Sequence, residues 1–275
     1  MKDQSELLER IADALERMAP PRHRRTDWLG FPAYVWTENG AQGVAKMDAP
    51  ELALLQGIDR QKAAVVANVT RLAQGSAAHD MLLWGARGMG KSALVRAAVL
   101  SSQARDQASI ALVQIGTDAL PTLSQLFTEL ARVERNFLVF IDDLGFGSED
   151  TAGPRHLRSW LEGGVQARPA NVRLAVTSNR RAIVERHSSE QDDPLNPRDA
   201  VDDNLALADR FGLSLGFHAC TQDDFLAIIK GYAEELGLEW DEAEALNWSK
   251  RRGARSGRIA RHFITELAGR AGKQF

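Results

Sequence analysis

Residues 85–92 read Gly-Ala-Arg-Gly-Met-Gly-Lys-Ser, which is the pattern G-x-x-x-x-G-K-S. An apolar run from Met81 to Trp84 precedes the pattern, and a helical pattern from Ala93 to Leu100 follows it. Glycines in such a loop let the backbone turn sharply, so that its N–H groups can point inward at a polyphosphate. The pattern therefore predicts a phosphate-binding loop, and a glycine turn that binds nothing is the alternative.

We expect the whole loop to surround the phosphates of a nucleotide, with two side chains in defined roles. The ammonium group of Lys91 is placed to contact the β- and γ-phosphates, and the hydroxyl of Ser92 is placed to ligate Mg²⁺. The expected nucleotide contacts in this loop are Gly85, Ala86, Arg87, Gly88, Met89, Gly90, Lys91 and Ser92.

A second chemical signal lies further along the chain, where the apolar run 137–141 ends in Asp142 and Asp143. A carboxylate at this strand end can hold the magnesium shell, so Asp142 is the second expected metal ligand. Asp143 is then the residue that could orient or deprotonate an attacking water. The alternative is a strand followed by a solvated turn of two aspartates.

A regular alternation of strands and helices must position these residues. The first helix, over 60–72, begins after Asp59, which can act as its cap. Its expected apolar stripe consists of Ala63, Val66, Val69 and Leu72. After the strand that precedes the loop, the expected elements are a strand over 109–115, a helix over 121–133, a strand over 137–141, a helix over 154–161 and strands over 172–176 and 213–217. This alternation predicts a three-layer α/β fold, with a largely parallel sheet and helices on both faces.

Both ends of the chain differ from this middle part. After Phe217 the strands stop, and three helical patterns predict a small all-helical lid, whose first helix begins at a capping box over 221–224. An amphipathic helix is expected over 5–18, docked on the protein's own body, on a sister subunit or on a partner. The expected divisions are an N-terminal helix (1–20), a linker and entry segment (21–49), an α/β nucleotide-binding domain (50–219) and a helical lid domain (220–275).

Composition excludes several classes of protein. The 275 residues are 44% hydrophobic and 26% charged with a formal net charge of −3, which is typical of a globular chain and not of a general polyanion binder. The single cysteine, Cys220, excludes an intrachain disulfide, and we expect it to be a small buried residue. The apolar runs are far too short to span a membrane and the charged start is unlike a signal peptide, so we expect a cytoplasmic protein with no membrane partner.

Six short motifs occur in order along the chain. They are Gly57–Lys62, Gly85–Gly88, Asp142–Leu144, Thr177–Arg181, Asp209–Leu213 and Arg255–Arg258. Together they resemble the AAA+ ATPases, and more narrowly a bacterial AAA+ family of ATP-binding proteins of unknown function. The resemblance covers about residues 50–268 and implies a P-loop NTPase core, ATP and Mg²⁺ as ligands, and assembly into a homo-oligomeric ring or open ring.

The resemblance also implies roles for four residues outside the phosphate loop. Ile58 is expected to lie against the adenine, and Asn179 matches sensor 1, whose amide hydrogen-bonds to water and to the γ-phosphate. Arg210 matches an arginine finger that is presented to a neighbouring subunit, where its guanidinium stabilises charge on the transferring phosphoryl group. Arg258 matches sensor 2, an arginine that touches the phosphates of its own subunit. For each arginine the alternative is an ordinary surface salt bridge.

Two departures from the family pattern bear on activity. Many AAA+ motors carry Glu where this chain has Asp143, and the shorter acid, which initiator-like and helicase-loader-like members share, indicates a slower, switch-like ATPase. The family often has an acid at the position of Gly147, whereas here Glu149 comes two residues later. This displacement argues against a catalytic role for Glu149.

The expected function is therefore hydrolysis of Mg·ATP to ADP and phosphate by an oligomer that moves its lid against a protein client. The first alternative is a slow ATP-dependent switch or loader on nucleic acid, suggested by the basic stretch 250–275. It stays second because no helix-turn-helix, zinc module or aromatic platform accompanies that stretch. A scaffold that does not hydrolyse nucleotide is a third reading. The acidic segment 187–204 is interpreted as a mobile loop or, alternatively, as a client contact.

Overall fold

The computed structural model describes residues 26–145, 160–161, 169–179 and 209–275. The expected N-terminal helix, Glu149 and the acidic segment 187–204 lie outside these residues. So does the expected helix over 154–161, apart from Trp160 and Leu161, which are helical.

Within the described residues, seven strands form one sheet in the order β2-β1-β4-β5-β6-β3-β7. The strands are β1 (Ala33–Thr37), β2 (Gly40–Val44), β3 (Met81–Gly85), β4 (Ile110–Ile115), β5 (Asn136–Ile141), β6 (Val172–Ser178) and β7 (Leu213–Phe217). Only the pair of β1 with β2 is antiparallel; every other neighbouring pair is parallel. Because the central strand β5 is covered on both faces, its residues 137–141 are all fully buried and apolar.

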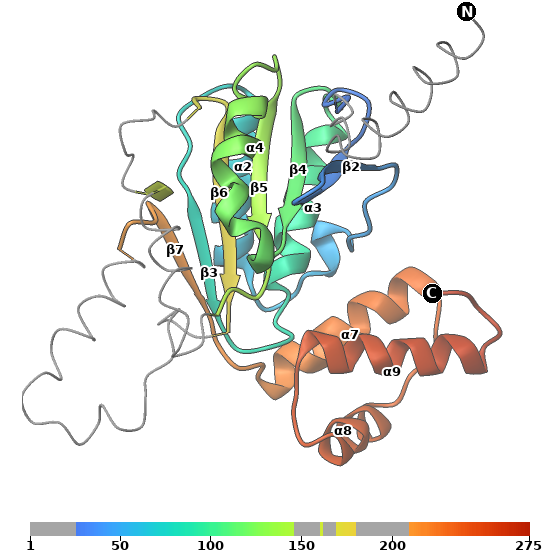
Figure 1. Cartoon of the computed structure of the whole chain (residues 1–275). Helices are drawn as coiled ribbons and strands as arrows, with labels where there is room; N and C mark the ends of the chain where they lie inside the picture. Colours follow the sequence, from blue (N-terminus) through green and yellow to red (C-terminus); the bar gives the residue numbers. More distant parts are fainter. Residues whose placement is uncertain (1–25, 146–159, 162–168, 180–208) are drawn as a thin grey trace, which may run out of the picture.

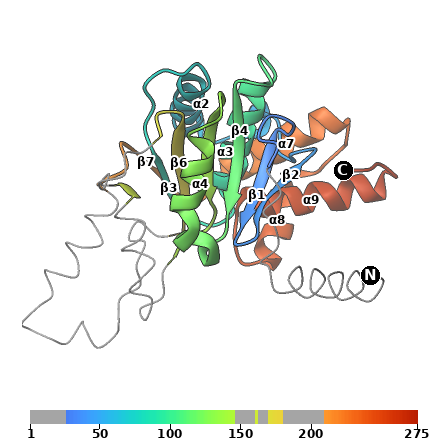
Figure 2. The ribbon, with the colours of Figure 1, turned by 45° about the horizontal axis from the view of Figure 1, so that its top comes forward.

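Helices cover both faces of the sheet (Figure 1). The helices α2 (Asp59–Ala73) and α3 (Lys91–Gln103) share one apolar core with the short helix η1 (Leu52–Leu54). The short helix η2 (Thr117–Thr122) and α4 (Leu123–Leu130) form a second core on the opposite face. Figure 2 shows α4 in front of the sheet and α2 and α3 behind it. The three-layer α/β fold that the alternation predicts is confirmed.

The segment expected as a linker, 21–49, in fact supplies the first two strands of the sheet. β1 pairs in parallel with β4 and folds back through a tight turn into β2. The buried guanidinium of Arg135 ties this segment down, because its Nη1 donates to the carbonyl oxygens of Trp28 (3.0 Å) and Phe31 (2.8 Å). Periodicity missed these strands because each has only five residues and β2 carries few apolar side chains.

The first helix of the core also differs from its expected form. Asp59 is not its cap but its first residue, and the Asp59 carboxylate lies 2.9 Å from Lys62 Nζ. The buried stripe consists of Val65, Asn68, Val69 and Leu72, whereas Ala63 is exposed. The expected stripe differs because it was built from apolar residues alone and so omitted Asn68. The amide of Asn68 can be buried, since it donates to the carbonyl oxygen of His79 and accepts from the N–H of His79.

The element expected as one helix over 121–133 is divided. Pro121 lies inside η2, and the α-helical part, α4, begins only at Leu123 and ends at Leu130. Proline has a fixed φ and no N–H, and Pro121 immediately precedes Thr122, the N-cap of α4.

Three helices follow β7, as expected: α7 (Gln222–Leu236), α8 (Glu242–Arg251) and α9 (Gly257–Arg270). Thr221 and Asp224 form the expected capping box of α7, and Ser256 caps α9. The buried apolar residues of this lid belong to the same core as those of α2 and α3. Figure 1 shows the three lid helices below the sheet. Cys220, at the junction, is buried as expected. Among the described helices, none combines the length and the apolar character that crossing a membrane requires.

Candidate nucleotide-binding site

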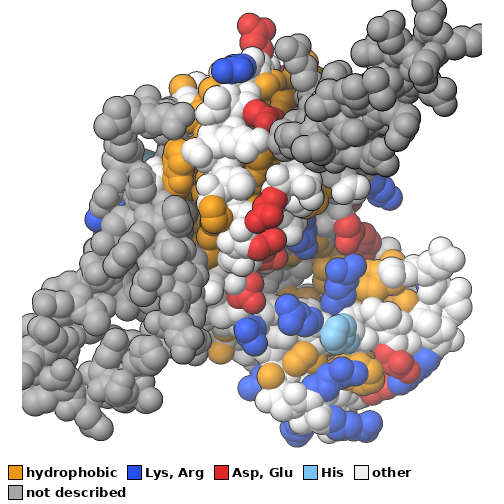
Figure 3. All heavy atoms as spheres, in the orientation of Figure 1, with side chains coloured by type: hydrophobic (Ala, Val, Ile, Leu, Met, Phe, Trp, Pro, Cys, Tyr) orange, Lys and Arg blue, Asp and Glu red, His pale blue; other side chains and the backbone are white. Residues whose placement is uncertain are grey.

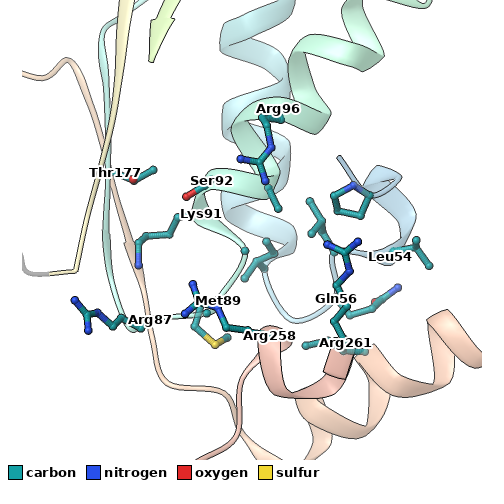
Figure 4. Close-up of a pocket in the computed structure, with 18 of the residues that line it drawn as sticks. Leu54, Gln56, Arg87, Met89, Lys91, Ser92, Arg96, Thr177, Arg258 and Arg261 are labelled. Carbon is teal, nitrogen blue, oxygen red and sulfur yellow. The ribbon is translucent and has the colours of Figure 1, made fainter. Parts of the chain in front are cut away.

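A cavity of about 510 Å³ lies between the phosphate loop, the ends of β5 and β6, and the lid. Eleven of the residues singled out in the sequence line it, namely Ile58, Arg87, Gly88, Met89, Gly90, Lys91, Ser92, Asp142, Asp143, Asn179 and Arg258. Figure 4 shows labelled side chains entering from α3 above and from α9 below. The fold therefore gathers residues that are up to 200 positions apart in the sequence (258 − 58 = 200).

The glycines of the phosphate loop are required by its geometry. Gly85 has φ +121°, and a Cβ there would lie 2.1 Å from the carbonyl oxygen of Phe217 in β7. Gly88 and Gly90 also have positive φ, of +72° and +83°. Residues other than glycine rarely adopt this conformation, so the turn of the loop depends on these three positions.

Lys91 is held inside the loop. Its Nζ donates to the carbonyl oxygens of Gly85 and Ala86, both at 2.8 Å, and to Oδ1 of Asn179 at 3.3 Å. Burial lowers the pKa of Lys91 below its ordinary value, while the carboxylates of Asp143 and Asp142 oppose that shift. Gly85 and Ala86 thus contribute to the site through their backbone, although they are not in the lining of the cavity.

The two expected metal ligands are in contact. Ser92 Oγ donates to Asp142 Oδ1 at 2.5 Å, and Thr177 Oγ1 donates to the same oxygen at 2.6 Å. A hydroxyl beside a single carboxylate suits Mg²⁺, which in nucleotide sites takes its other ligands from phosphate oxygens and water. No group of three or more His, Cys, Asp or Glu residues that could hold a metal by itself occurs among the described residues.

Asp143 adopts an unusual backbone conformation. Its φ is +52°, and it is the only residue other than glycine with positive φ in the described part of the chain. Its N–H donates to Thr177 Oγ1 at 2.8 Å, and its Oδ1 accepts a hydrogen bond from the amide of Asn179. Strained conformations of this kind cluster at functional sites, where the surroundings hold them in place. Asn179 therefore links the carboxylate of Asp143 to the ammonium of Lys91.

The lid closes the cavity from below. The backbone N–H of Arg258 donates to the carbonyl oxygen of Gly88 at 3.2 Å, so α9 contacts the phosphate loop directly. Arg261, one turn further along α9, and Tyr232 of α7 also line the cavity. The sequence analysis assigned neither residue a role in this site, although the spacing of Arg261 from Arg258 along one helix is a signal that could have indicated it.

Apolar side chains also line the cavity. Ile58 is buried, and Pro50, Leu54 and Leu55 are further apolar residues of the lining. Such side chains are suited to a flat aromatic ring such as a nucleobase. The contact of Ile58 with adenine stays a prediction. Leu54 and Leu55 were missed because the entry segment shows no periodicity.

Thr177 and Arg96 are two further cavity residues. Thr177 begins one of the six motifs, but the sequence analysis assigned no role to either residue. The hydroxyl of Thr177 donates to the carboxylate of Asp142 and accepts from the backbone N–H of Asp143. A hydroxyl residue at the end of the strand beside β5 is the signal that could have indicated it.

Arg210 is not in this cavity. It precedes β7, whose register places Leu213 opposite Met81 and Phe217 opposite Gly85, so Arg210 and the phosphate loop lie beyond opposite ends of these strands. A strand of five residues spans roughly 16 Å. Arg210 lines a different hollow, together with His79, Asp80 and Arg173.

The fold and this site define the class of protein: the chain has the nucleotide-binding fold of the AAA+ superfamily. It belongs to the DUF815 family, described as a protein of unknown function, whose model matches residues 30–271. The fold that the resemblance implies is confirmed, since solved structures with this fold are similar to the chain. None of the curated proteins compared with this chain matches it.

Solved structures support the same fold. A variant of Thermotoga maritima RuvB is similar at 19% identity with a TM-score of 0.55, covering 81% of this chain and 66% of that one. Orc1 of Aeropyrum pernix, solved in complex with DNA, is similar at 14% identity with a TM-score of 0.53, covering 80% of this chain and 65% of that one. The AAA domain of FIGL-1 in complex with ADP is similar at 17% identity with a TM-score of 0.51, covering 82% and 75%. The chain spans less than two thirds of the RuvB and Orc1 chains.

Proposed function

We propose that this protein binds Mg·ATP and hydrolyses it to ADP and phosphate. The observation that carries the proposal is the contact of Ser92 with Asp142, 2.5 Å apart, at the edge of a cavity that Lys91 and Asp143 also line. A hydroxyl, a carboxylate, an ammonium group and a second carboxylate are the parts that phosphoryl transfer to water requires. ADP is bound by the similar FIGL-1 domain, which supports a nucleotide as the ligand here.

Each residue has a distinct task in this proposal. The N–H groups of the loop and the ammonium of Lys91 hold the phosphates, and Ser92 with Asp142 would hold Mg²⁺, which neutralises charge on the phosphates when bound. The carboxylate of Asp143 orients the attacking water and accepts its proton. The amide of Asn179 keeps that carboxylate and Lys91 in one arrangement, because it hydrogen-bonds to both.

We infer that the active form is a homo-oligomer. Arg210 lies beyond the strand end opposite to the phosphate loop, so it can meet a terminal phosphate only in another copy of the chain. This supports the assignment of Arg210 as a finger that acts between subunits. A surface role for Arg210 within one subunit is the competing explanation.

The lid is the part that we expect to act on a protein client. Since the carbonyl oxygen of Gly88 is hydrogen-bonded to Arg258, a change in the loop on nucleotide binding or phosphate release reaches α9 directly. Domain closure around a ligand is a common way to convert such a change into movement. Nucleotide turnover would then switch or remodel the bound client.

A slow switch or loader on nucleic acid is the second candidate. It is favoured by the exposed basic residues at the end of α8 and beyond it, Lys250, Arg251, Arg252 and Arg255. Figure 3 shows Lys and Arg side chains spread over the visible face of the lid. The similar Orc1 structure contains DNA. ATP turnover that rises on addition of DNA or RNA would favour this candidate over a protein client.

The test begins with nucleotide binding by the wild-type chain and by Lys91→Ala. Calorimetry should show Mg·ATP binding that Lys91→Ala abolishes, because the substitution removes the point charge at the β- and γ-phosphates. Exposed Lys46→Ala, which is outside the cavity, serves as the matched control. Equal ATP affinity of Lys91→Ala and wild type would contradict the proposed site.

A second experiment addresses the client. The Asp143→Asn variant should hold ATP without turning it over, so it should retain a client that the wild type releases. Proteins captured by the Asp143→Asn variant would be compared in the presence of ATP and of ADP. Only a protein whose capture requires ATP would be accepted as a client. Absence of measurable phosphate release by the wild type would favour the scaffold reading instead.

A further inference from the structure

Arg87 lines the cavity, yet among the phosphate-loop residues it has a long side chain that is mostly exposed. Its neighbour Met89 is buried, whereas the side chain of Arg87 is 76% exposed. Figure 4 shows Arg87 directed away from Arg258 and Arg261. A loop that needed only backbone N–H groups and small residues would gain nothing from a guanidinium at this position.

The guanidinium of Arg87 lies beside the residue that is proposed to orient water. Its Nη2 is 4.0 Å from Oδ2 of Asp143, whose other carboxylate oxygen accepts from Asn179. Asn179 in turn accepts from Lys91. The positive charge of Arg87 is also one of those that lower the pKa of Lys91. Arg87, Asp143, Asn179 and Lys91 are therefore linked by successive contacts, and Asp143 and Lys91 adjoin the proposed magnesium ligands Asp142 and Ser92 in sequence.

Stabilisation of the fold does not account for this arrangement. Both side chains of the pair are exposed, at 76% and 61%, and 4.0 Å is long for an ion pair. Exposed pairs of this kind contribute little to stability. The guanidinium is thus held only loosely by Asp143 and is free to turn toward a stronger anionic partner.

We propose that Arg87 is a further arginine of the ATPase site, one that contacts the terminal phosphate of the triphosphate bound to its own subunit. A planar guanidinium suits two oxygens of a phosphate group, which carries more charge than the carboxylate of Asp143. On ATP binding, Arg87 exchanges Asp143 for the γ-phosphate and leaves the carboxylate available to water. The inference rests on the proposed ATPase function and adds a residue to it.

The exchange has a defined place in the reaction. The oxygen of water bonds to the γ-phosphorus while the bond from that phosphorus to the bridging oxygen breaks, and the electron pair of the broken bond stays on ADP. The carboxylate of Asp143 takes a proton from the water and later releases it to solvent. Arg87 stabilises the charge on the non-bridging oxygens throughout the reaction, and it forms no covalent bond.

A comparison of triphosphate with diphosphate tests the proposal. Calorimetry in the presence of Mg²⁺ would measure the affinities of two ligands, ADP and the non-hydrolysable ATP analogue AMP-PNP. Each ligand would be titrated into wild type, Arg87→Ala and Arg87→Lys. In Arg87→Ala the affinity for AMP-PNP should fall on the order of 10-fold, and turnover about 100-fold, with ADP affinity unchanged within about twofold. Arg87→Lys should recover part of the AMP-PNP affinity, because it keeps the charge but not the paired donors.

Controls separate this inference from the proposed function. Arg105→Ala removes an exposed arginine outside the cavity and should match wild type. If wild type itself does not bind AMP-PNP, the proposed function fails. If wild type binds AMP-PNP, two results would overturn the role of Arg87 alone. One is that Arg87→Ala keeps wild-type affinity for both AMP-PNP and ADP. The other is that its affinities for both ligands fall equally while its melting temperature is unchanged. If the melting temperature of Arg87→Ala is below that of wild type, Arg87→Gln takes its place, and its ratio of AMP-PNP affinity to ADP affinity is compared with that of wild type.

A mixing experiment decides which subunit Arg87 serves. Arg87→Ala and Lys91→Ala subunits carry their defects in the same site if Arg87 acts within its own subunit, so a mixture should hydrolyse no more ATP than the two separately. Recovery of turnover in the mixture would show that Arg87 acts on a neighbour, which would overturn the proposal.

Discussion

The carbonyl oxygen of Gly88 accepts a hydrogen bond from the backbone N–H of Arg258 at 3.2 Å, which joins the phosphate loop to the lid through main-chain atoms. The fit is close, since a Cβ on Gly88 would lie 2.9 Å from Ser256 Oγ, and one on Gly257 would lie 3.1 Å from the Gly88 oxygen. Loop and lid therefore form one structure around the nucleotide site, and a movement of either must be accommodated by the other.

The first prediction follows from this contact. Gly88→Ala should separate α9 from the loop and destabilise the protein by about 1–3 kcal/mol, because alanine is strained at φ +72° and its Cβ meets Ser256. Nucleotide affinity should fall with it. Chemical denaturation and calorimetry would measure the two effects. Gly75→Ala is the control, since Gly75 also has positive φ (+69°) but no heavy atom within 4 Å of its added Cβ. Equal losses in both variants would show that strain alone, and not the lid contact, is responsible.

Asp143→Asn should bind Mg·ATP with nearly unchanged affinity and turn it over at least about 100-fold more slowly, because an amide does not accept a proton from water. Single-turnover phosphate release would measure the chemical step without interference from product release. Asp118→Asn, an exposed acid after β4, is the matched control. Wild-type turnover in Asp143→Asn would indicate another base, with Glu149 the next residue to examine.

Arg210→Ala should retain ATP binding and lose hydrolysis if Arg210 completes the site of a neighbouring subunit. A mixture of Arg210→Ala with Lys91→Ala subunits should then recover part of the turnover, because the Lys91 variant still presents its Arg210 to an intact phosphate loop. Turnover per subunit should also rise with protein concentration. A monomer whose turnover is independent of concentration would exclude this arrangement.

Cys220 provides a prediction on pH. Burial raises the pKa of its thiol from 9.0 to about 11 in the folded chain. The folded state holds the thiol proton more tightly than the unfolded state. The contribution of this thiol to the free energy of unfolding is therefore complete below about pH 9 and is lost as pH rises to about 11. The unfolding free energy of wild type should thus fall by up to about 2 kcal/mol more than that of Cys220→Ala over this interval. Parallel pH profiles of the two proteins would contradict the shift.

The local sequence determines the phosphate loop and its neighbours because their chemistry is contained in adjacent residues. Gly85, Lys91 and Ser92 act from one short segment whose backbone conformation depends on its glycines. Likewise, β5 and its two aspartates are recognisable from an apolar run that ends in acids. The capping box at Thr221 is equally local, and it is present as expected.

Other features depended on contacts between distant segments. β1 and β2 are strands because they pair with β4 and with each other, and the buried face of α2 includes Asn68 because the backbone of His79 lies opposite it. Thr177, Arg261 and Tyr232 join the cavity only because the sheet order and the lid bring them there. Sequence periodicity reports which face of an element is apolar. The packing of the whole chain decides which elements meet. It also decides that Arg210 lies beyond the strand end opposite to the phosphate loop.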